Sequence, residues 1–128
     1  MILIVGGSFQ GKKEYAKSLF SLEKKDMIDG AVCPLEDIYT CKCIYHFHEW
    51  VKRILEGEKD LSNMAERLQK ENPKIIIISN ELGYGVVPIQ AFDREYRETT
   101  GRVCTKIAGA ASQVHRVICG IGTVIKHG

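Results

Sequence analysis

The sequence predicts an α/β fold with a mostly parallel central sheet, and three observations lead to this prediction. The apolar runs ILIV at residues 2–5 and KIIIIS at 74–79 have no polar alternation, which is typical of strands buried on both faces. Glycine-rich loops follow both runs directly. Stretches with apolar residues at helical spacing separate the runs. This alternation predicts helices on both faces of the sheet, and therefore three layers.

Length and composition are those of a globular domain. The chain has 128 residues, of which 45% are hydrophobic and 27% charged, and we expect residues 1–128 to form a single domain. The formal net charge is +2 and the basic residues are not clustered, which argues against a nucleic-acid partner. No run is long enough to span a bilayer, no signal peptide is visible, and the five cysteines form no Cys-x-x-Cys pair. These features predict a cytoplasmic protein.

The elements of the first half follow in order. Residues 2–5 predict a strand, residues 6–11 a turn, and residues 12–22 a helix with an apolar stripe. The segment DMIDGAV at 26–32 is a weaker candidate strand, because two aspartates interrupt it. Apolar residues at helical spacing predict a helix over residues 38–55, which GEKDLSN at 57–63 ends.

The second half contains the clearest strand. A capped helix is expected from residue 62 or 63 to 71, and Asn72-Pro73 ends it. Four consecutive isoleucines place the strand at 74–79 in the centre of the sheet. The loop NELGYGVVP occupies residues 80–88, and a helix with a possible break at Gly101 is expected over 89–111. VHRVICG at 114–120 predicts the last strand, followed by a tail that glycines loosen.

The loop after the first strand has the spacing of a phosphate-binding loop. GGSFQGKK at 6–13 gives Gly, four residues, then Gly-Lys, between a strand and a helix. Its backbone N–H groups, the positive end of the helix and the Lys12 ammonium can all face phosphate oxygens. Lys13 stands where a Ser or Thr hydroxyl usually holds Mg²⁺. The candidate nucleotide-binding residues in this P-loop fold are Gly6, Gly7, Ser8, Phe9, Gln10, Gly11, Lys12 and Lys13.

Other polar residues at strand ends are candidates for catalysis or metal binding. Asp29, at the end of the second strand, is a candidate to hold Mg²⁺ through water. Because Lys13 takes the place of the usual hydroxyl, we expect Lys13→Thr to raise phosphoryl transfer. Lys12 and Glu81 are the candidate catalytic residues. Glu81 would act as a general base or Mg²⁺ ligand, with bonding of the loop backbone as its alternative role. Arg102 is a candidate phosphate ligand, with a solvated helix face or a subunit salt bridge as the alternative.

Two histidines fall in the predicted helix at 38–55. His46 and His48 are two positions apart, and on a helix such residues point to different faces. This spacing argues against a paired metal site, so we expect surface positions for them. Whether one of them acts as a nucleophile stays open.

Longer motifs resemble one enzyme family. The C-terminal part, KIIIISNELGYGVVP followed by REYRETTGRVCTKIAGAASQVHRVICGIGTVIK, resembles the bifunctional adenosylcobinamide kinase/adenosylcobinamide-phosphate guanylyltransferase family. Residues 6–12 match the family's nucleotide loop. The second loop and the helix motif match at Asn80, Glu81, Gly83, Gly85, Pro88, Arg97, Gly101, Arg102 and Val103, whereas Cys104 stands where the family commonly has Asn.

The resemblance implies a role in cobalamin (vitamin B12) biosynthesis. Family members phosphorylate adenosylcobinamide with ATP or GTP, with Mg²⁺ as the expected cofactor, and then attach GMP through a guanylylated histidine. They are homo-oligomers, typically trimers. Here SLEKK at 21–25 replaces the family segment that contains this histidine. The alternative is therefore a catalytically impaired paralogue that only binds nucleotide or corrinoid, as a sensor or assembly partner.

Overall fold

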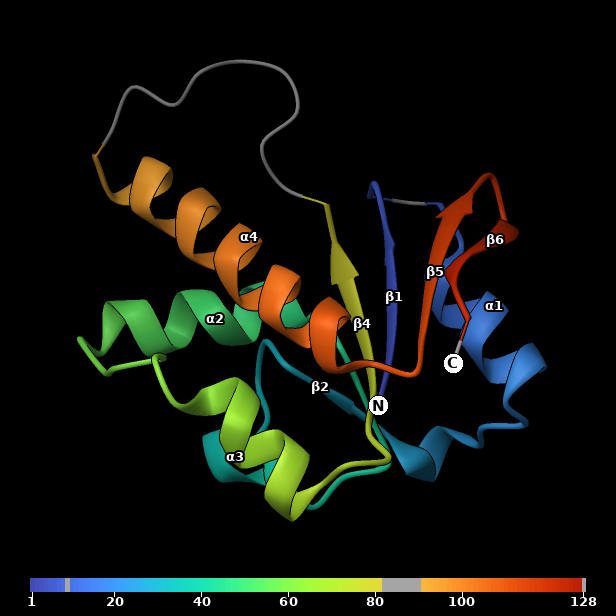
Figure 1. Ribbon diagram of the computed structural model, residues 1–128, viewed down its shortest axis with the longest axis horizontal. Helices are drawn as coiled ribbons and strands as arrows, with labels where there is room; N and C mark the ends of the chain where they lie inside the picture. Colours follow the sequence, from blue (N-terminus) through green and yellow to red (C-terminus); the bar gives the residue numbers. More distant parts are fainter. Residues whose placement is uncertain (9, 82–90, 128) are drawn as a thin grey trace.

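The computed structural model describes residues 1–8, 10–81 and 91–127, and in these ranges it forms one six-stranded sheet (Figure 1). The strand order is β2-β3-β4-β1-β5-β6. All neighbouring strands are parallel except β5 and β6, which are antiparallel. The strand bounds are β1 Ile2–Gly6, β2 Met27–Asp29, β3 Cys43–Tyr45, β4 Ile76–Asn80, β5 Gln113–Ile118 and β6 Ile121–Lys126. The α/β class with a mostly parallel sheet is confirmed.

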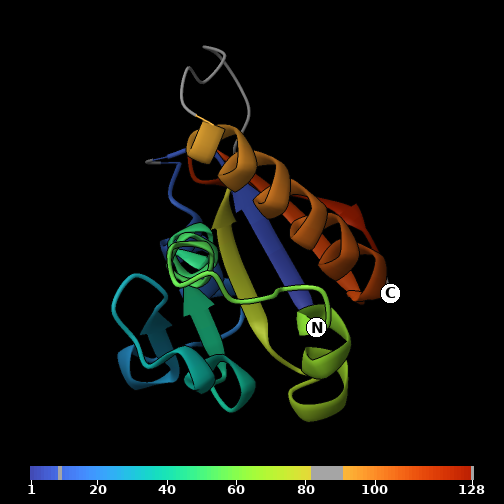
Figure 2. The same cartoon turned by 90° about the vertical axis from the view of Figure 1, so that its left-hand side faces the viewer.

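Helices cover both faces of the sheet, as the three-layer prediction requires. Helix α1 (Lys12–Leu19) lies on one face, whereas α2 (Phe47–Glu56), α3 (Met64–Glu71) and α4 (Ala91–Ala110) lie on the other (Figures 1 and 2). Two short 3₁₀ helices flank the edge strand β2 along the chain: η1 (Lys24–Asp26) lies between α1 and β2, and η2 (Leu35–Tyr39) lies between β2 and β3. Among the described residues, no helix is both long and apolar enough to cross a membrane.

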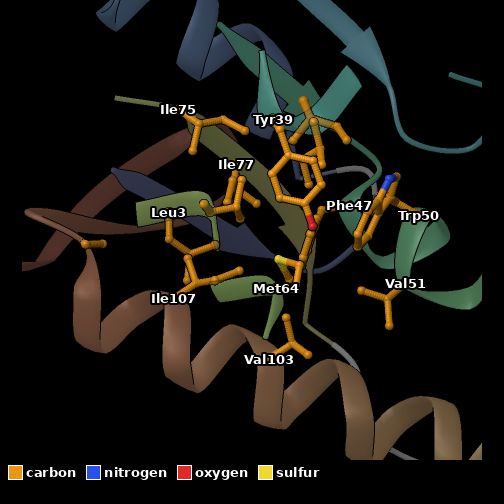
Figure 3. Packing of buried hydrophobic residues seen from close by; sticks show 14 of the residues in the cluster. Leu3, Tyr39, Phe47, Trp50, Val51, Met64, Ile75, Ile77, Val103 and Ile107 are labelled. Carbon is orange, nitrogen blue, oxygen red and sulfur yellow. The ribbon is translucent and has the colours of Figure 1, made fainter. Parts of the chain in front are cut away.

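Alternate residues of the central strands enter two separate cores. Leu3 of β1 and Ile77 of β4 point toward α2 and α4, where Phe47, Val103 and Ile107 pack against them (Figure 3). Neighbouring residues of the same strands face α1 and pack around Ala16. Because both faces are covered by helices, β1 and β4 must be apolar at nearly every position, which explains the continuous apolar runs in the sequence.

The helix predicted over residues 38–55 is wrong in its first half. Residues 35–39 form η2, residues 43–45 form β3, and α2 begins only at Phe47. Cys43 and Ile44 pair with Met27 and Ile28 on one side and with β4 on the other. Pairing with a strand on each side holds this short segment extended, although the spacing of its apolar residues also fits a helix.

Three other predictions of local structure need correction. Helix α1 ends at Leu19 rather than at residue 22. Helix α4 runs through Gly101 without a break; this glycine is exposed, and a helix tolerates one glycine at a cost of about 1 kcal/mol. The tail expected to be loose is strand β6, joined to β5 by a two-residue turn in which Cys119 and Gly120 both have positive φ.

Candidate functional site

Two glycines shape the connection between β1 and α1. A Cβ atom on Gly6 would lie 2.5 Å from the carbonyl oxygen of Val117, which is too close for non-bonded atoms. Gly11 precedes α1 with φ 81°, a left-handed conformation that favours glycine. The loop therefore leads directly into the helix N-terminus, where first-turn amide groups lack helical acceptors and favour an anion.

Lys12 projects back into the loop rather than toward solvent. Its Nζ donates to the carbonyl oxygen of Gly7 at 2.7 Å and to Asn80 Oδ1 at 2.8 Å, and the residue is only 8% exposed. Burial lowers the pKa of Lys12, while the nearby Glu81 carboxylate acts in the opposite direction. A buried ammonium group thus lies among loop oxygens at the carboxyl ends of β1 and β4.

Asn80 links the loop to the end of β4. Its Nδ2 donates to Ser8 Oγ at 3.0 Å, while its Oδ1 accepts from Lys12. Its backbone N–H donates to Nδ1 of His48 at 3.2 Å. The side chain of Asn80 therefore fixes the positions of both a loop hydroxyl and the loop lysine.

Glu81 is held in an ion pair. Its Oε1 lies 2.9 Å from Arg116 Nε, and Arg116 Nη2 donates to Oε2 at 3.2 Å. Its backbone N–H donates to the carbonyl oxygen of Gly6 at 2.9 Å. Arg116 thus binds both carboxylate oxygens of Glu81. The hydrogen bond to Gly6 agrees with the alternative role of Glu81 as a bonding partner of the loop backbone.

Lys13 does not enter the loop. Its ammonium lies over the ring of Tyr45, 4.1 Å from the ring centroid, which is a cation–π geometry. A small cavity of about 70 Å³ lies beside it, lined also by Lys12 and Asn80. The second lysine therefore adds positive charge next to the loop without occupying it.

A cavity of about 380 Å³ opens next to the loop, at the carboxyl ends of β2, β3 and β4. Its lining residues are Ser8 and Asn80, which belong to the loop network, together with Asp29, Ala31, His46, His48 and Glu49. His46 precedes α2 and His48 lies in its first turn. The argument that two residues at this spacing on a helix point to different faces therefore does not apply to this pair. His46 is exposed, but His48 is buried, which contradicts the surface position expected for it.

Asp29 is bonded on the same oxygen by two groups. Its Oδ1 accepts from the backbone N–H of Ala31 and from His46 Nδ1, both at 2.9 Å. Partial burial acts to raise the pKa of Asp29, but the hydrogen bonds from Ala31 and His46 and the charges of His46 and Lys13 outweigh it, and the pKa is lowered. Among the described residues, no group of three or more His, Cys, Asp or Glu side chains is arranged to hold a metal ion.

The structure does not bring Arg102 to the loop. Arg102 donates to Thr99 Oγ1 at 3.2 Å, one turn earlier on α4. It lines a separate cavity of about 350 Å³ between α4 and residues 55–62, which shares no lining residue with the cavities beside the loop. Phe9, Gly83, Gly85 and Pro88 lie outside the described residues.

The β5–β6 turn contacts the loop, which the sequence did not predict. Gln10 Oε1 accepts from the N–H of Cys119 at 2.6 Å, and Gly120 N–H donates to the carbonyl oxygen of Gln10 at 2.7 Å. The only sequence signal was the pair Cys119-Gly120 between two β-like segments, which fits a two-residue hairpin turn. These bonds fasten the loop to the turn that follows β5, the strand next to β1 in the sheet.

A mostly parallel sheet, whose first strand runs through a Gly-x4-Gly-Lys loop into a helix, defines a P-loop type of α/β fold. The sequence profile of the cobinamide kinase / cobinamide phosphate guanyltransferase family matches residues 33–125 of this chain. The chain belongs to this family. The matched range begins after the loop at 6–13, so the loop itself is assigned from its sequence and geometry.

Two curated relatives are similar to more than half of the chain. Both are bifunctional adenosylcobalamin biosynthesis proteins named CobU. The protein from Escherichia coli (strain K12) is 32% identical over 80 residues, covering 61% of this chain and 44% of the relative. The protein from Salmonella typhimurium (strain LT2) is 42% identical over 76 residues, covering 59% of this chain and 41% of the relative. The chain thus spans less than half the length of the curated relatives it matches.

Proposed function

We propose that this chain binds the phosphate groups of a purine nucleoside triphosphate, ATP or GTP, at the loop of residues 6–12. The observation that carries this proposal is the buried Lys12 ammonium, held by Gly7 and Asn80 at the N-terminus of α1. Both of its partners are neutral oxygens, and a phosphate oxygen offers a stronger, charged acceptor in the same place. The amide groups of the loop and of the first helical turn supply further donors.

The proposed reaction is transfer of a phosphoryl group from the nucleotide to adenosylcobinamide, within adenosylcobalamin biosynthesis. Family membership and the names of the two relatives support this choice of pathway. In such transfers the protein mainly positions the phosphates and neutralises charge, which is the task we assign to Lys12 and the loop amides. We do not extend the proposal to guanylyl transfer, because SLEKK at 21–25 contains no histidine. From the same family resemblance we propose that the chain forms a homo-oligomer, a trimer. Measurement of the molar mass in solution by light scattering tests this directly.

The donor set near the loop fits Mg²⁺ poorly. Lys13 replaces the usual hydroxyl, the Oδ1 atom of Asp29 already accepts two hydrogen bonds, and Glu81 is paired with Arg116. Hard oxygen ligands are what Mg²⁺ requires, and a lysine cannot be one. We therefore assign the ion no step, and the Mg²⁺ dependence expected from the sequence stays a prediction, to be tested by titrations with MgCl₂ and with EDTA.

Calorimetric titration with ATP and GTP tests the binding proposal. Replacing Lys12 by Met keeps the length of the side chain but removes its charge, so we expect Kd to rise about 10- to 100-fold, the range of a charged hydrogen bond. Lys24→Met, on an exposed lysine of η1, is the matched control and should leave Kd unchanged. Absence of binding heat with either nucleotide at millimolar concentration would refute the proposal.

A second candidate function is binding without catalysis, and the observation in its favour is Lys13. Incubation with GTP or ATP, Mg²⁺ and adenosylcobinamide, followed by mass spectrometry of the corrinoid, separates the two. Phosphorylated corrinoid supports the kinase, whereas nucleotide binding without product supports a catalytically impaired paralogue that serves as a sensor or assembly partner.

A further inference from the structure

The cavity beside the loop contains two histidines with different hydrogen-bond partners. Ser8 and Asn80 connect its lining to Lys12 of the proposed phosphate site, and Asp29, His46, His48 and Glu49 are its titratable residues. The two imidazole rings are edge to face, with their centroids 5.9 Å apart. A group transferred from a nucleotide on the loop has to leave toward such a neighbouring space, so the chemistry of its lining determines which acceptor it suits.

His46 is oriented by Asp29. The distance between His46 Nδ1 and Asp29 Oδ1 is 2.9 Å, and the same oxygen accepts from the Ala31 N–H. An ionised carboxylate can only accept hydrogen bonds, so Nδ1 of His46 is the donor. In the neutral ring this leaves the lone pair on Nε2, the nitrogen opposite to Asp29.

His48 has the opposite arrangement of protons. Its Nδ1 accepts the backbone N–H of Asn80, so the proton of the neutral ring is on Nε2. Burial, together with the charges of His46 and Lys12, lowers the pKa of His48 to about 4, so it is neutral near pH 7. Its 3.9 Å approach to Glu49 is therefore not an ion pair at that pH. The two rings that line the cavity thus differ: Nε2 of His46 can accept a proton, whereas Nε2 of His48 carries one.

Glu81, the general base that the sequence favours, is poorly placed for that task because Arg116 engages both of its carboxylate oxygens. The side chain of His46 is 51% exposed and lines the cavity, and its Nδ1 is taken up by Asp29. Its backbone has φ 53° and ψ 41°, a left-handed conformation that non-glycine residues rarely adopt. This conformation sets the ring at the carboxyl end of β3, beside Asp29.

We propose that His46 is the general base of the phosphoryl transfer and that Asp29 is its positioning residue, an inference that rests on the proposed function. The substrate class is an alcohol. Nε2 of His46 takes the hydroxyl proton as the oxygen forms a bond to the γ-phosphorus. The bond from that phosphorus to the β–γ bridging oxygen breaks, and the nucleoside diphosphate leaves with the electron pair. The His48 Nε2–H donates a hydrogen bond to the same acceptor group.

The test compares wild type with His46→Asn, Asp29→Asn and a control, His127→Asn, whose histidine is exposed and lies outside this cavity. Asparagine is chosen at position 46 because it tolerates the left-handed backbone. The measurements are kcat and KM for adenosylcobinamide, Kd for the nucleotide by calorimetry, and the tautomer of His46 from ¹⁵N NMR shifts. The NMR readout is independent of catalysis.

We expect His46→Asn to lower kcat about 100-fold, the lower end of general-base effects, with the nucleotide Kd within about twofold of wild type. Asp29→Asn should lower kcat about 10-fold and weaken the preference of His46 for a proton on Nδ1, because a neutral amide oxygen is a weaker acceptor than a carboxylate. The wild-type spectrum should show His46 protonated on Nδ1 when neutral.

Four results would overturn the assignment. A kcat for His46→Asn within about threefold of wild type, with nucleotide binding intact, removes His46 from the chemistry and leaves the proposed function standing. A neutral His46 that carries its proton on Nε2 would refute both the positioning role of Asp29 and the assignment of Nε2 as the atom that accepts the hydroxyl proton. Nucleotide binding without any phosphoryl transfer in wild type overturns the base but not the nucleotide site, whereas absence of nucleotide binding overturns both.

Discussion

Acidification should destabilise this protein through His48, a buried histidine beside the loop. The ring is neutral in the folded protein because burial lowers its pKa from about 6.5 to about 4. In the unfolded chain the same ring takes up a proton near pH 6.5. Between these two values the unfolded state binds more protons than the folded state, so the free energy of unfolding falls as the pH falls.

The magnitude follows from the two pKa values. The folded and unfolded values differ by about 2.5 pH units, from 6.5 to about 4. Each unit corresponds to about 1.4 kcal/mol, so the contribution lost on going from pH 7 to below pH 4 is about 3 kcal/mol. No large reduction for solvent screening applies, because the His48 side chain is only 8% exposed. A loss of this size is a large part of the total stability of a typical domain.

Urea unfolding of wild type and His48→Asn between about pH 7 and about pH 4 measures this contribution. The asparagine Oδ1 can still accept the N–H of Asn80, but it does not titrate. Other groups titrate in both proteins, so the difference between the two pH curves isolates His48. We expect wild type to lose about 3 kcal/mol more than the variant over this range. Parallel curves would refute the reasoning.

Three further changes have defined outcomes. Gly6→Ala places a Cβ 2.5 Å from a backbone oxygen, so it should lower the free energy of unfolding by about 2 kcal/mol in thermal unfolding and weaken nucleotide binding. Gly101→Ala has open space around the new Cβ and should stabilise α4. Equal effects of the two substitutions on stability would contradict this reasoning. Ile77→Ala, at a fully buried position of β4, should lower the free energy of unfolding in urea by about 3 kcal/mol, and a loss below about 1 kcal/mol would contradict it. Lys13→Thr restores the hydroxyl of the usual loop and should raise Mg²⁺-dependent phosphoryl transfer; unchanged turnover would show that Lys13 does not limit the reaction.

Sequence patterns predicted those elements whose signals are local and unopposed. The apolar runs that became β1 and β4 are continuous, because each strand is covered on both faces. The spacing of the loop around Lys12 was equally clear in the sequence. Only glycine fits the steric limits at Gly6 and the positive φ at Gly11. The end of α3 before Asn72-Pro73 followed from proline's effect on the preceding residue.

The errors fell where pairing in the folded protein outweighs local preference. Residues 43–45 have helical apolar spacing, but β2 and β4 offer hydrogen-bond partners on both sides, and the segment is a strand. Strand β6 is rich in β-branched residues, which favour strands, but Gly122 interrupts it and none of its residues is buried, so the apolar alternation of a half-buried strand is missing. Its pairing with β5 defines it.

By itself, therefore, the sequence determined the fold class, the central strands, the phosphate-binding type of loop and the likeness to the cobinamide kinase / cobinamide phosphate guanyltransferase family. The fold class, the strands and the loop type follow from steric and burial requirements that act within a few neighbouring residues, whereas the likeness to the family rests on the resemblance of the motifs at 74–88 and 94–126. Only the tertiary structure decided that Glu81 is paired with Arg116, that His48 is buried, and that Asp29 meets His46. Hydrogen bonds and charge pairs depend on distances across the sheet between residues far apart in the chain, and spacing along the sequence does not specify those distances.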